Sequence, residues 1–456
     1  MKTCPKCGAP VAPEARECPR CGTKTGGRFL KEPQKATGPS IGKWIWIPIV
    51  AVVLVAAIAF GAAALLGGRE DSRMEAATEP LTVPTTEAPT TEPPTEAPTT
   101  EPPTEPPTEP APVYRNPLNG EILDEPYTGR IFISTISNVP DALPHVSANQ
   151  ADIVFETFVN YSIIRCIGLY SNISEVEQIG SVRSTRIMFN DITEHYGAIL
   201  FHAGGSSQVL QDARDRGIEN FSVDTWDATQ AGISIRDEYR KRYIGLEHSL
   251  LALGPTLEAY AETQGYSITG DPEKDYLLRF TEDGTPADGE EAGDIAITIT
   301  QSKYKKDTIL NYAPELGKYV YSQYGEVMKD GVTEEPEAYT NVIIMEATIG
   351  TEGMYQVADF VLGGEGYFAC GGKIIRIKWT CDGEDQPFRF MTMDGEDLQL
   401  GVGNTYIAIT EPGFALTYGP GTWVTPEAPE TVPEESAVPD EGESLLEEPT
   451  EGTEAP

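Results

Sequence analysis

The chain has 456 residues, a net charge of −38 and seven cysteines, and its charge is divided unevenly. Residues 1–43 carry nine basic and three acidic residues, whereas residues 114–423 carry a net charge of about −25. Nucleic-acid binding depends on Lys and Arg side chains that displace phosphate counterions, so the bulk of so acidic a chain is not expected to bind DNA or RNA. The length exceeds one ordinary domain and allows a large hydrophobic core.

The first 25 residues carry two CPxCG motifs, which predict a zinc ribbon over residues 1–25. In each motif the Pro and the Gly permit the tight turn that points two thiolates at one tetrahedral ion. The expected ligands of a structural zinc ion are Cys4, Cys7, Cys18 and Cys21. A pair of disulfides is the alternative, but the flanking basic residues favour a reducing cytoplasmic location, and therefore zinc.

A basic juxtamembrane segment, 26–43, leads into 23 uncharged residues at 44–66. That length is enough to cross a bilayer of about 30 Å as a helix. The basic residues before it predict a single-pass membrane protein with a cytoplasmic N-terminus and an extracellular C-terminal part. Residues 67–113 repeat Pro, Thr and Glu and predict a disordered stalk, and the acidic residues 424–456 predict a disordered tail.

The remaining sequence predicts an α/β (α+β) fold in two lobes. In residues 114–270, β-branched runs predict strands at 130–137, 151–159, 163–171 and 198–205, and apolar spacings of three and four predict helices at 186–196, 206–217 and 247–265. Residues 271–423 have little helical spacing. They predict a smaller β-rich lobe with strands at 294–300, 318–325, 341–350, 365–372, 373–381, 387–393 and 405–410.

The first candidate cluster for chemistry is the predicted strand QADIVFE (150–156), followed by Arg165. Strand alternation places Asp152 and Glu156 on one face, where a carboxylate pair is able to act as an acid/base couple. A solvated strand face has the same pattern, so this reading stays open.

The second cluster is GSVRSTR (180–186), which presents Arg183, Ser184 and Arg186 before a predicted helix. Guanidinium groups bind carboxylates and phosphates, and a helix N-terminus adds free amides and a partial positive charge, so we expect an anion site. The alternative is that these arginines pair with Glu156 or Asp152 and brace the lobe.

The third cluster is HAGGSSQ (202–208), where a predicted strand ends and a helix begins. Gly204 and Gly205 allow a ligand to approach the backbone, and Ser206 suits the start of the helix. His202 is able to act there as a base or a donor, although a buried histidine with one satisfied hydrogen bond is the commoner case.

In the predicted globular region, residues 114–423, no nucleophile motif completes an enzyme: GxSxG, HExxH, a P-loop and the full triplet of SxxK, SDN and KTG are absent there. Cys166 follows Arg165, which favours a reactive thiolate, but an apolar strand favours an inert thiol. Cys370 and Cys381 form a disulfide only if their strands are neighbours, and spacing leaves this open.

In this order and separation, QADIVFE, GSVRSTR and HAGGSSQ, together with EHSLLAL, NVIIMEA and GEGYFACGGK, resemble the YerB family of Gram-positive cell-surface proteins. The resemblance spans about residues 116–412. It implies a mixed α/β N-terminal part, a smaller β-rich C-terminal part and a connection with the cell envelope, and it supplies no catalytic residues.

We therefore expect a non-enzymatic envelope protein that binds an anionic wall component, such as a peptidoglycan stem carboxylate, or a wall-synthesis partner. The cleft is expected to use Arg165, Arg183, Arg186, His202 and the amides near 204–206. The alternative is a cell-wall hydrolase or transferase in which Glu156 and His202 exchange protons across the same cleft. A third possibility is that the β-rich lobe serves as a protein-interaction platform.

Overall fold

The computed structural model describes residues 2–3, 10–11, 112–160, 163–300, 306–353, 355–383 and 385–421. The four predicted zinc ligands, the predicted span at 44–66, nearly all of the predicted stalk and the acidic tail lie outside these residues. Within the described ranges, no helix is both long enough and apolar enough to span a bilayer. At the N-terminus, β1 (Lys2–Thr3) pairs in antiparallel register with β2 (Pro10–Val11).

One long sheet runs through most of the described chain. Its strands, in spatial order, are β10 (Asn220–Ser222), β9 (Ile199–His202), β5 (Phe132–Ser137), β7 (Ile163–Tyr170), β6 (Ile153–Asn160), β27 (Thr405–Thr410), β20 (Asn341–Glu346), β23 (Gly364–Cys370), β24 (Lys373–Thr380) and β14 (Glu290–Glu291), with β25 (Arg389–Thr392) also pairing with β24.

Six strands of this sheet, β10, β9, β5, β6, β27 and β20, point in the same direction. Their carboxyl ends therefore lie along one edge, which we call the carboxyl edge. The antiparallel strand β7 begins at this edge with residues 163–165. Ligands commonly gather at such an edge, because strand ends and loops converge there.

The two predicted lobes share the long sheet. Strand β27 comes from the C-terminal part of the chain, yet it lies between β6 and β20, and Ile407 pairs with Phe155 on one side and Ile343 on the other. All three of these side chains are buried. The core of the N-terminal part is therefore continuous with that of the C-terminal part.

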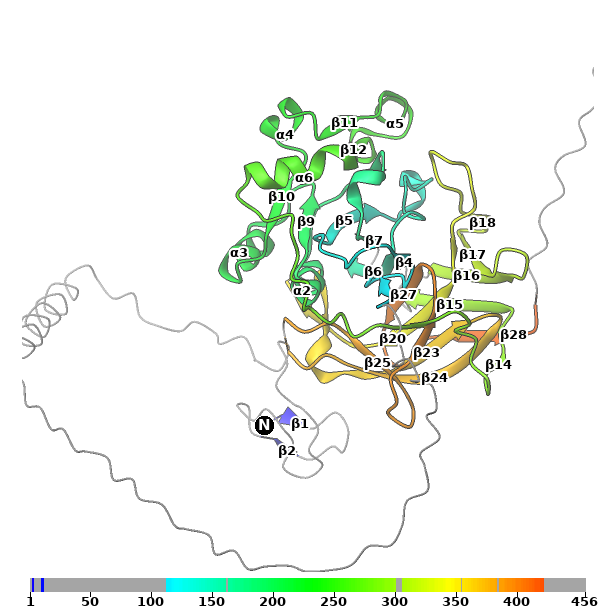
Figure 1. Cartoon of the computed structure of the whole chain (residues 1–456). Coiled ribbons are helices and arrows are strands. Elements are labelled where there is room, and N and C mark those ends of the chain that lie inside the picture. Colours follow the sequence, from blue (N-terminus) through cyan, green and yellow to red (C-terminus); the bar gives the residue numbers. More distant parts are fainter. Residues whose placement is uncertain are drawn as a thin grey trace, which may run out of the picture. The chain divides into compact units, whose positions relative to one another are not determined.

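The α-helices of the described residues all lie between 187 and 263. They are α2 (Ile187–Tyr196), α3 (Ser207–Asp215), α4 (Trp226–Gln230), α5 (Glu238–Tyr243) and α6 (Gly254–Thr263). Figure 1 shows them around the end of the long sheet that carries β9 and β10, away from β24 and β25. Helix α2 covers one face of the sheet, where the Tyr196 ring packs 6.3 Å from that of Phe155.

A second sheet of six strands belongs to the C-terminal part. It contains β18 (Glu326–Val327), β17 (Lys318–Gln323), β16 (Lys306–Ala313), β15 (Asp294–Thr300) and β28 (Leu416–Gly419), with β19 (Ala338–Tyr339) also pairing with β17. The smaller sheets join β11 (Ser234–Arg236), β12 (Leu250–Ala252) and β8 (Ile179–Gly180); β13 (Arg279–Thr281) and β26 (Gln399–Gly401); β21 (Thr348–Glu352) and β22 (Tyr355–Asp359); and β3 (Tyr114–Arg115) and β4 (Ile122–Leu123). Short 3₁₀ helices are η2 (Pro140–Ala142), η3 (Ile173–Glu175), η4 (Leu246–His248) and η5 (Phe360–Leu362).

The mixed, strand-rich α+β class agrees with the prediction from sequence, but one predicted helix is wrong in its first half. The segment 247–265 contains the strand β12, and α6 begins only at Gly254. The apolar run at 250–252 is buried as the central strand between β11 and β8, so its spacing reflects burial on both faces. The sequence also did not predict the short helices α4 and α5.

Because the sheet is shared, a cavity in β27 is expected to destabilise both parts of the fold together. Ile407→Ala removes a side chain that is 1% exposed and should lower the free energy of unfolding by roughly 2–5 kcal/mol. Urea unfolding followed by tryptophan fluorescence and by circular dichroism should show one coincident transition. The control Ile122→Ala, at a side chain 67% exposed, should change stability by less than about 0.5 kcal/mol. Two separate transitions would contradict a shared core.

Candidate functional site

At the carboxyl edge the structure brings together the motifs GSVRSTR and HAGGSSQ. Residues 182–185 run between the ends of β5 and β9, where the amide of Arg183 donates to the carbonyl of Thr135 at 2.9 Å. On the other side, the amide of Ala203 donates to the carbonyl of Arg183 at 2.9 Å, and that of Thr185 to the carbonyl of Gly204 at 2.9 Å. Backbone pairing thus fixes both loops side by side.

Two arginine side chains are buried under these loops. Arg165, at the start of β7, donates to the carbonyl of Ser184, and Arg186, just before α2, donates to the carbonyl of Thr185 at 2.7 Å. The guanidinium of Arg186 also lies 4.7 Å from the centroid of the Tyr355 ring on β22. Arg165 is 3% exposed and Arg186 is 9% exposed.

Among the described residues, neither Arg165 nor Arg186 forms an ion pair with a carboxylate. The Nε atoms of both are buried without a hydrogen-bond partner in the same part of the chain. By contrast Arg216, between α3 and β10, contacts three carboxylates, those of Asp191, Glu194 and Asp212. Within the described part of the chain, carboxylates therefore neutralise Arg216 but neither Arg165 nor Arg186.

Electrostatics at this edge favour a negative ligand. Burial, followed by repulsion from Arg186 and Arg183, holds the pKa of Arg165 well below its usual range. Burial likewise lowers the pKa of Arg186. The N-termini of α2 and α3 begin here as well, and each adds a partial positive charge and free amides. We call Arg165, Arg183 and Arg186 the arginine cluster.

Arg183 is the most accessible member of the arginine cluster. Its side chain is 23% exposed and lies 3.4 Å from the carboxylate of Glu247, which is itself 67% exposed. Such a surface ion pair contributes little and is readily exchanged for another anion. The predicted alternative, in which Arg183 and Arg186 pair with Glu156 or Asp152, is wrong. Asp152 instead accepts hydrogen bonds from the side chain of Asn119 and from the backbone amide of Ser171.

The glycine loop adopts the conformation that its residues suggest. Gly204 has a φ of +66°, in the left-handed region that favours glycine, and its amide donates to Ser222 Oγ at 2.8 Å. A Cβ atom at Gly205 would lie 3.2 Å from both Leu210 and Thr185, so the loop is tightly packed there. Ser206 caps α3 by accepting from the amide of Val209.

His202 is a buried histidine with a structural partner. Its Nε2 lies 3.1 Å from Oδ1 of Asn220, whose own Nδ2 donates to the carbonyl of Ile218. Nε2 is therefore the protonated nitrogen. Burial lowers the pKa of His202, while the hydrogen bond to Asn220 opposes that shift. The ring is neutral near pH 7 and helps hold β9 to β10.

The structure separates Glu156 from the other candidate residues. Glu156 pairs with Cys166, which pairs with Ile136, so these three side chains share one face of the sheet. Ser134 lies two residues before Ile136 on β5 and therefore on the same face, and it pairs with Phe201 of β9. Phe201 thus shares the face of Glu156, and the next residue, His202, lies on the opposite face. Proton exchange between Glu156 and His202 across one cleft is therefore incompatible with this fold.

Glu156 is instead the centre of a buried polar network between the two parts of the chain. Lys306 Nζ donates to Glu156, to Thr308 Oγ1 at 2.7 Å and to Tyr321 Oη at 3.0 Å. The Tyr406 hydroxyl also donates to Glu156. Burial pushes the pKa of Glu156 upward, but the Lys306 charge and these hydrogen bonds outweigh it and hold the pKa below its ordinary value.

The network continues to a second buried pair. Asn138 Nδ2 donates to Glu156 at 2.7 Å, and Asn138 Oδ1 lies 3.1 Å from His145 Nε2. The other ring nitrogen of His145 lies 2.9 Å from the carboxylate of Glu337. Both ring nitrogens of His145 thus lie within hydrogen-bond distance of oxygen atoms.

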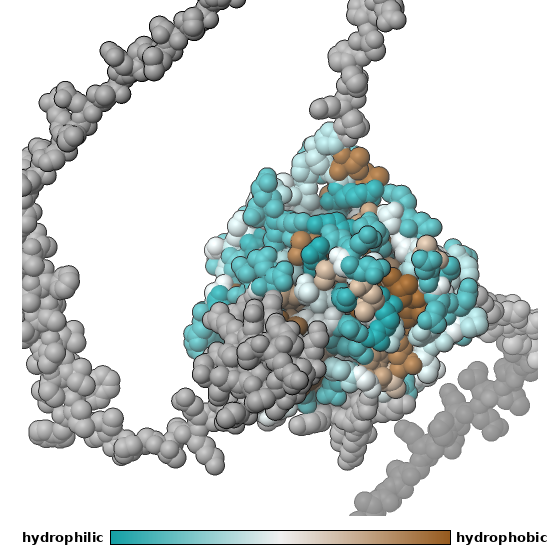
Figure 2. Space-filling model, turned by 90° about the horizontal axis from the view of Figure 1, so that it is seen from below, coloured by the Kyte–Doolittle hydropathy of each residue, from teal (hydrophilic) through white to brown (hydrophobic). Residues whose placement is uncertain are grey.

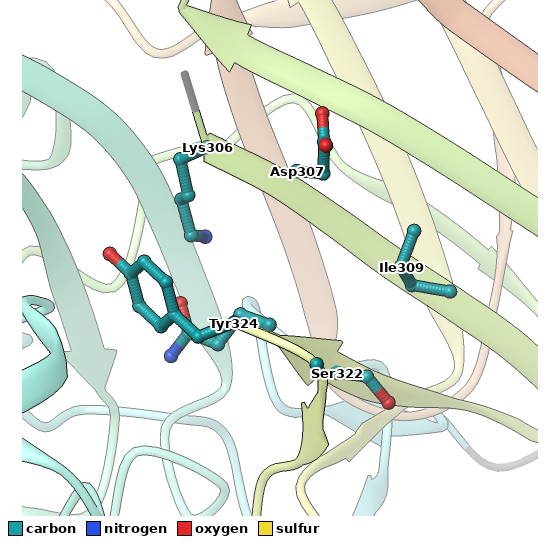
Figure 3. A pocket seen from close by; sticks show the side chains of 7 residues that line it. Lys306, Asp307, Ile309, Ser322 and Tyr324 are labelled. Atoms are coloured by element: carbon teal, nitrogen blue, oxygen red, sulfur yellow. The ribbon is translucent and has the colours of Figure 1, made fainter. Parts of the chain in front are cut away.

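A cavity of about 470 Å³ opens beside this network, lined by residues of β16 and β17 and by the turn after β17. Figure 3 shows the Lys306 side chain pointing toward the Tyr324 ring, whose centroid is 5.9 Å from Nζ. All three donor positions of the Lys306 ammonium are used by Glu156, Thr308 and Tyr321. Lys306 is therefore an ion-pair partner rather than a nucleophile.

The three downstream cysteines, Cys166, Cys370 and Cys381, are buried, and none of them forms a disulfide among the described residues. Burial, reinforced by the charge of Glu156, raises the pKa of Cys166 well above its usual range. Of the two alternatives that the sequence left open for Cys166, this favours an inert thiol over a reactive thiolate. Cys370 lies at the end of β23 and Cys381 follows the end of β24. Antiparallel pairing of these strands puts the two ends far apart, so the two cysteines do not form a disulfide.

Sequence reasoning missed Lys306, Tyr355 and Asn138. A basic run, KYKK at 303–306, was a visible signal in an acidic segment, but nothing in it indicates a partner 150 residues earlier. Tyr355 lies in a hairpin without a motif. Asn138 follows β5 and has the composition of an ordinary turn residue.

The fold and the site define an α+β protein of two parts that share one sheet, and comparisons agree with that class. The family models described as "Protein of unknown function (DUF3048)" match residues 118–267 for the N-terminal domain and residues 297–407 for the C-terminal domain. A zinc-ribbon domain model matches residues 3–25. The chain therefore belongs to the DUF3048 family, the YerB-like proteins, and carries a zinc-ribbon domain in addition.

One relative and one solved structure make the likeness specific. A Bacillus subtilis (strain 168) protein named "Putative lipoprotein YerB" is 25% identical over 319 residues, which is 69% of this chain and 91% of the relative. The crystal structure of YerB from Bacillus subtilis matches with a TM-score of 0.57 and 21% identity over 66% of this chain and 99% of that chain. At that identity the solved structure supports the fold alone.

The Lys306–Glu156 pair predicts a defined response to substitution. Lys306→Met leaves a buried carboxylate without its cation and should destabilise the protein by roughly 3–5 kcal/mol in urea unfolding at pH 7. The double variant Lys306→Met/Glu156→Gln removes both charges and should recover a large part of that loss. A double variant as unstable as the single variant would mean that the ion pair is not the relevant interaction.

The same pair predicts the direction of acid sensitivity. The pKa of Glu156 is lower in the folded protein than its ordinary value of 4.5. The ionised Glu156 side chain therefore stabilises the fold above pH 4.5, and this stabilisation is lost as the pH falls through the pKa of the folded state. Between pH 5 and pH 3, urea midpoints of the native protein should therefore fall more steeply than those of Lys306→Met/Glu156→Gln. Parallel pH profiles would contradict this assignment.

Proposed function

We propose that this chain is a membrane-anchored, extracytoplasmic envelope protein whose arginine cluster binds an anionic ligand. The observation that carries the proposal is the burial of Arg165 and Arg186 without a carboxylate partner among the described residues. Uncompensated buried cations are costly, so a site that keeps two of them together is best explained by a ligand that supplies the negative charge.

The hydrogen-bond donors of the arginine cluster suit carboxylate or phosphate groups. Guanidinium forks form paired hydrogen bonds with either anion, and the first amides of α2 and α3 add donors of the kind that bind anions at helix N-termini. Arg183 meets the ligand first, because it is the exposed member of the arginine cluster. A carboxylate-bearing wall component, such as a peptidoglycan stem peptide, has this chemistry, as does an acidic segment of a wall-synthesis partner.

The location rests on the N-terminal sequence and on the relative. The apolar segment 44–66, preceded by basic residues, is read as a single membrane span with the N-terminus in the cytoplasm. The name of the Bacillus relative, a lipoprotein, agrees with a surface role by a different anchor. In this proposal residues 67–113 form the stalk and residues 114–423 act outside the cell.

In the cytoplasmic zinc ribbon, Cys4, Cys7, Cys18 and Cys21 would hold the metal ion. The β1–β2 pair supports this, because antiparallel pairing of residues 2–3 with 10–11 brings together the two ends of the segment that contains Cys4 and Cys7. Zinc would supply folding free energy to a segment too short for a hydrophobic core of its own.

Anion binding is tested by isothermal titration of the full chain, in detergent, with soluble muropeptides. Arg186→Gln removes one charge of the arginine cluster and should weaken binding by roughly 10-fold or more, since a charged hydrogen bond contributes about 1.5–3 kcal/mol. Arg376→Gln is the matched control, because Arg376 is an exposed arginine on β24 that pairs with Glu365. Equal affinities for Arg186→Gln and the native protein would end the proposal.

Zinc binding is tested on the same purified chain by elemental analysis. We expect one zinc ion per chain, released when the four thiolates are modified, and lost in Cys18→Ser/Cys21→Ser. Cys370→Ser, at a buried free thiol of the C-terminal part, should retain it. A chain without zinc and with its N-terminal cysteines oxidised would instead support the disulfide alternative.

A further inference from the structure

The antiparallel strands β21 and β22, which we call the hairpin, reach along the carboxyl edge to the arginine cluster. Strand β21 follows β20, whose carboxyl end lies at this edge, and β22 packs against β6 and α2. In the described chain the hairpin forms a two-stranded sheet of its own. It is therefore joined to the long sheet through its ends, and it covers residues that belong to other elements.

Two side chains of the hairpin contact the elements that form the proposed anion site. The Tyr355 ring lies with its centroid 4.7 Å from the guanidinium of Arg186, just before α2. Near the turn of the hairpin, Glu352 Oε2 accepts a hydrogen bond from Gln208 Nε2 on α3 at 3.3 Å. The hairpin thus touches the first turns of both helices whose N-termini face the arginine cluster.

Polar atoms that could hold an anion are buried in the region that the hairpin covers. Within the described residues, Arg165 Nε, Arg186 Nε and Thr157 Oγ1 are buried without a hydrogen-bond partner. Thr157 on β6 pairs in register with Arg165 on β7, so these two side chains share one face of the sheet. Each of the three atoms is able to donate a hydrogen bond, and leaving such groups buried and unpaired is costly. An anion held between them would satisfy all three.

A cover has to move before an anion reaches these atoms, because Arg165 is 3% exposed and Arg186 is 9% exposed. The loops at 182–185 and 203–205 are poor candidates for this movement, since backbone hydrogen bonds tie them to β5 and to each other. The hairpin, in contrast, meets α2 and α3 through side chains. The hairpin is therefore the cover that moves at the lower cost.

We propose that the hairpin is a lid over the arginine cluster and that Tyr355 is the latch that keeps it closed. The proposal rests on the proposed anion binding and adds a conformational step to it. Arg183, whose side chain is 23% exposed, receives the anion first, and opening of the hairpin then admits it to Arg165 and Arg186. Elements that gate a site in this way are held by few contacts, as the hairpin is.

The outer side of the hairpin is polar enough to stay in water while the lid moves. Thr348 and Thr351 of β21 are exposed, and hydrophilic residues likewise cover most of the face shown in Figure 2. On the inner side, Val357 packs in a small buried cluster with Ile187 of α2 and Val209 of α3. Opening therefore separates a small apolar contact and leaves the main core intact.

The first test locks the hairpin to α3 in the full chain. In Gln208→Cys/Glu352→Cys, a short bis-maleimide joins the two thiols, and mass spectrometry confirms the bridge. Isothermal titration with soluble muropeptides then compares this variant before and after bridging. The bridged protein should bind at least tenfold more weakly, because Arg165 and Arg186 stay covered.

The matched control is Glu365→Cys/Arg376→Cys, because these two side chains also form an exposed pair, between the neighbouring strands β23 and β24. The same reagent on this control should leave muropeptide affinity unchanged. Absence of binding by the native chain would overturn the proposed function and the lid with it. Binding by the native chain, together with equal affinities before and after the 208–352 bridge, would overturn the lid alone.

Hydrogen exchange of the full chain, without muropeptide, tests the latch independently of any bridge. Tyr355→Ala removes the ring from Arg186 and should speed exchange of the β21 and β22 amides by roughly fivefold, the size expected for one cation–π contact. Tyr355→Phe keeps a ring and should exchange almost as slowly as the native protein. The amides of β20, within the long sheet, should exchange alike in all three proteins. Exchange in β21 and β22 that Tyr355→Ala leaves unchanged would overturn the latch.

Discussion

The insertion of β27 between β6 and β20 is the constraint on which the rest of the structure depends. It joins a strand from the end of the chain to one near its beginning, and at the same place the Lys306–Glu156 ion pair crosses between the two parts. A buried ion pair adds little net stability in itself but strongly penalises any arrangement that separates the two charges. The pair therefore favours the arrangement in which the two parts meet at β27.

The carboxyl edge concentrates positive charge in an otherwise acidic protein. The chain has ample carboxylates to neutralise arginines, as the three around Arg216 show. Within the described residues, however, Arg165 and Arg186 contact carbonyl oxygens and an aromatic ring rather than carboxylates. Backbone pairing of the loops at 182–185 and 203–205 holds these cations in place. In our proposal the anion therefore meets donors that are already in position, which reduces the cost of binding.

Local patterns in the sequence predicted the strands β5, β6, β7 and β9, the helix α3 with its Ser206 cap, and the meeting of GSVRSTR with HAGGSSQ. They did not predict which face of the sheet each side chain occupies across several strands, because the face depends on register between strands far apart in the chain. Glu156 and His202 were therefore grouped together although they lie on opposite faces. Lys306 was missed for the same reason, since its partner is 150 residues away.

The central claim, that the arginine cluster binds an anion rather than serving as a neutralised brace, is tested most directly by diffraction from crystals soaked in selenate. The account predicts an anomalous peak for selenium within hydrogen-bond distance of Arg186 and close to the N-terminus of α3, absent in Arg186→Gln crystals. Peaks confined to other surfaces, with a protein carboxylate against Arg165 or Arg186, would contradict it.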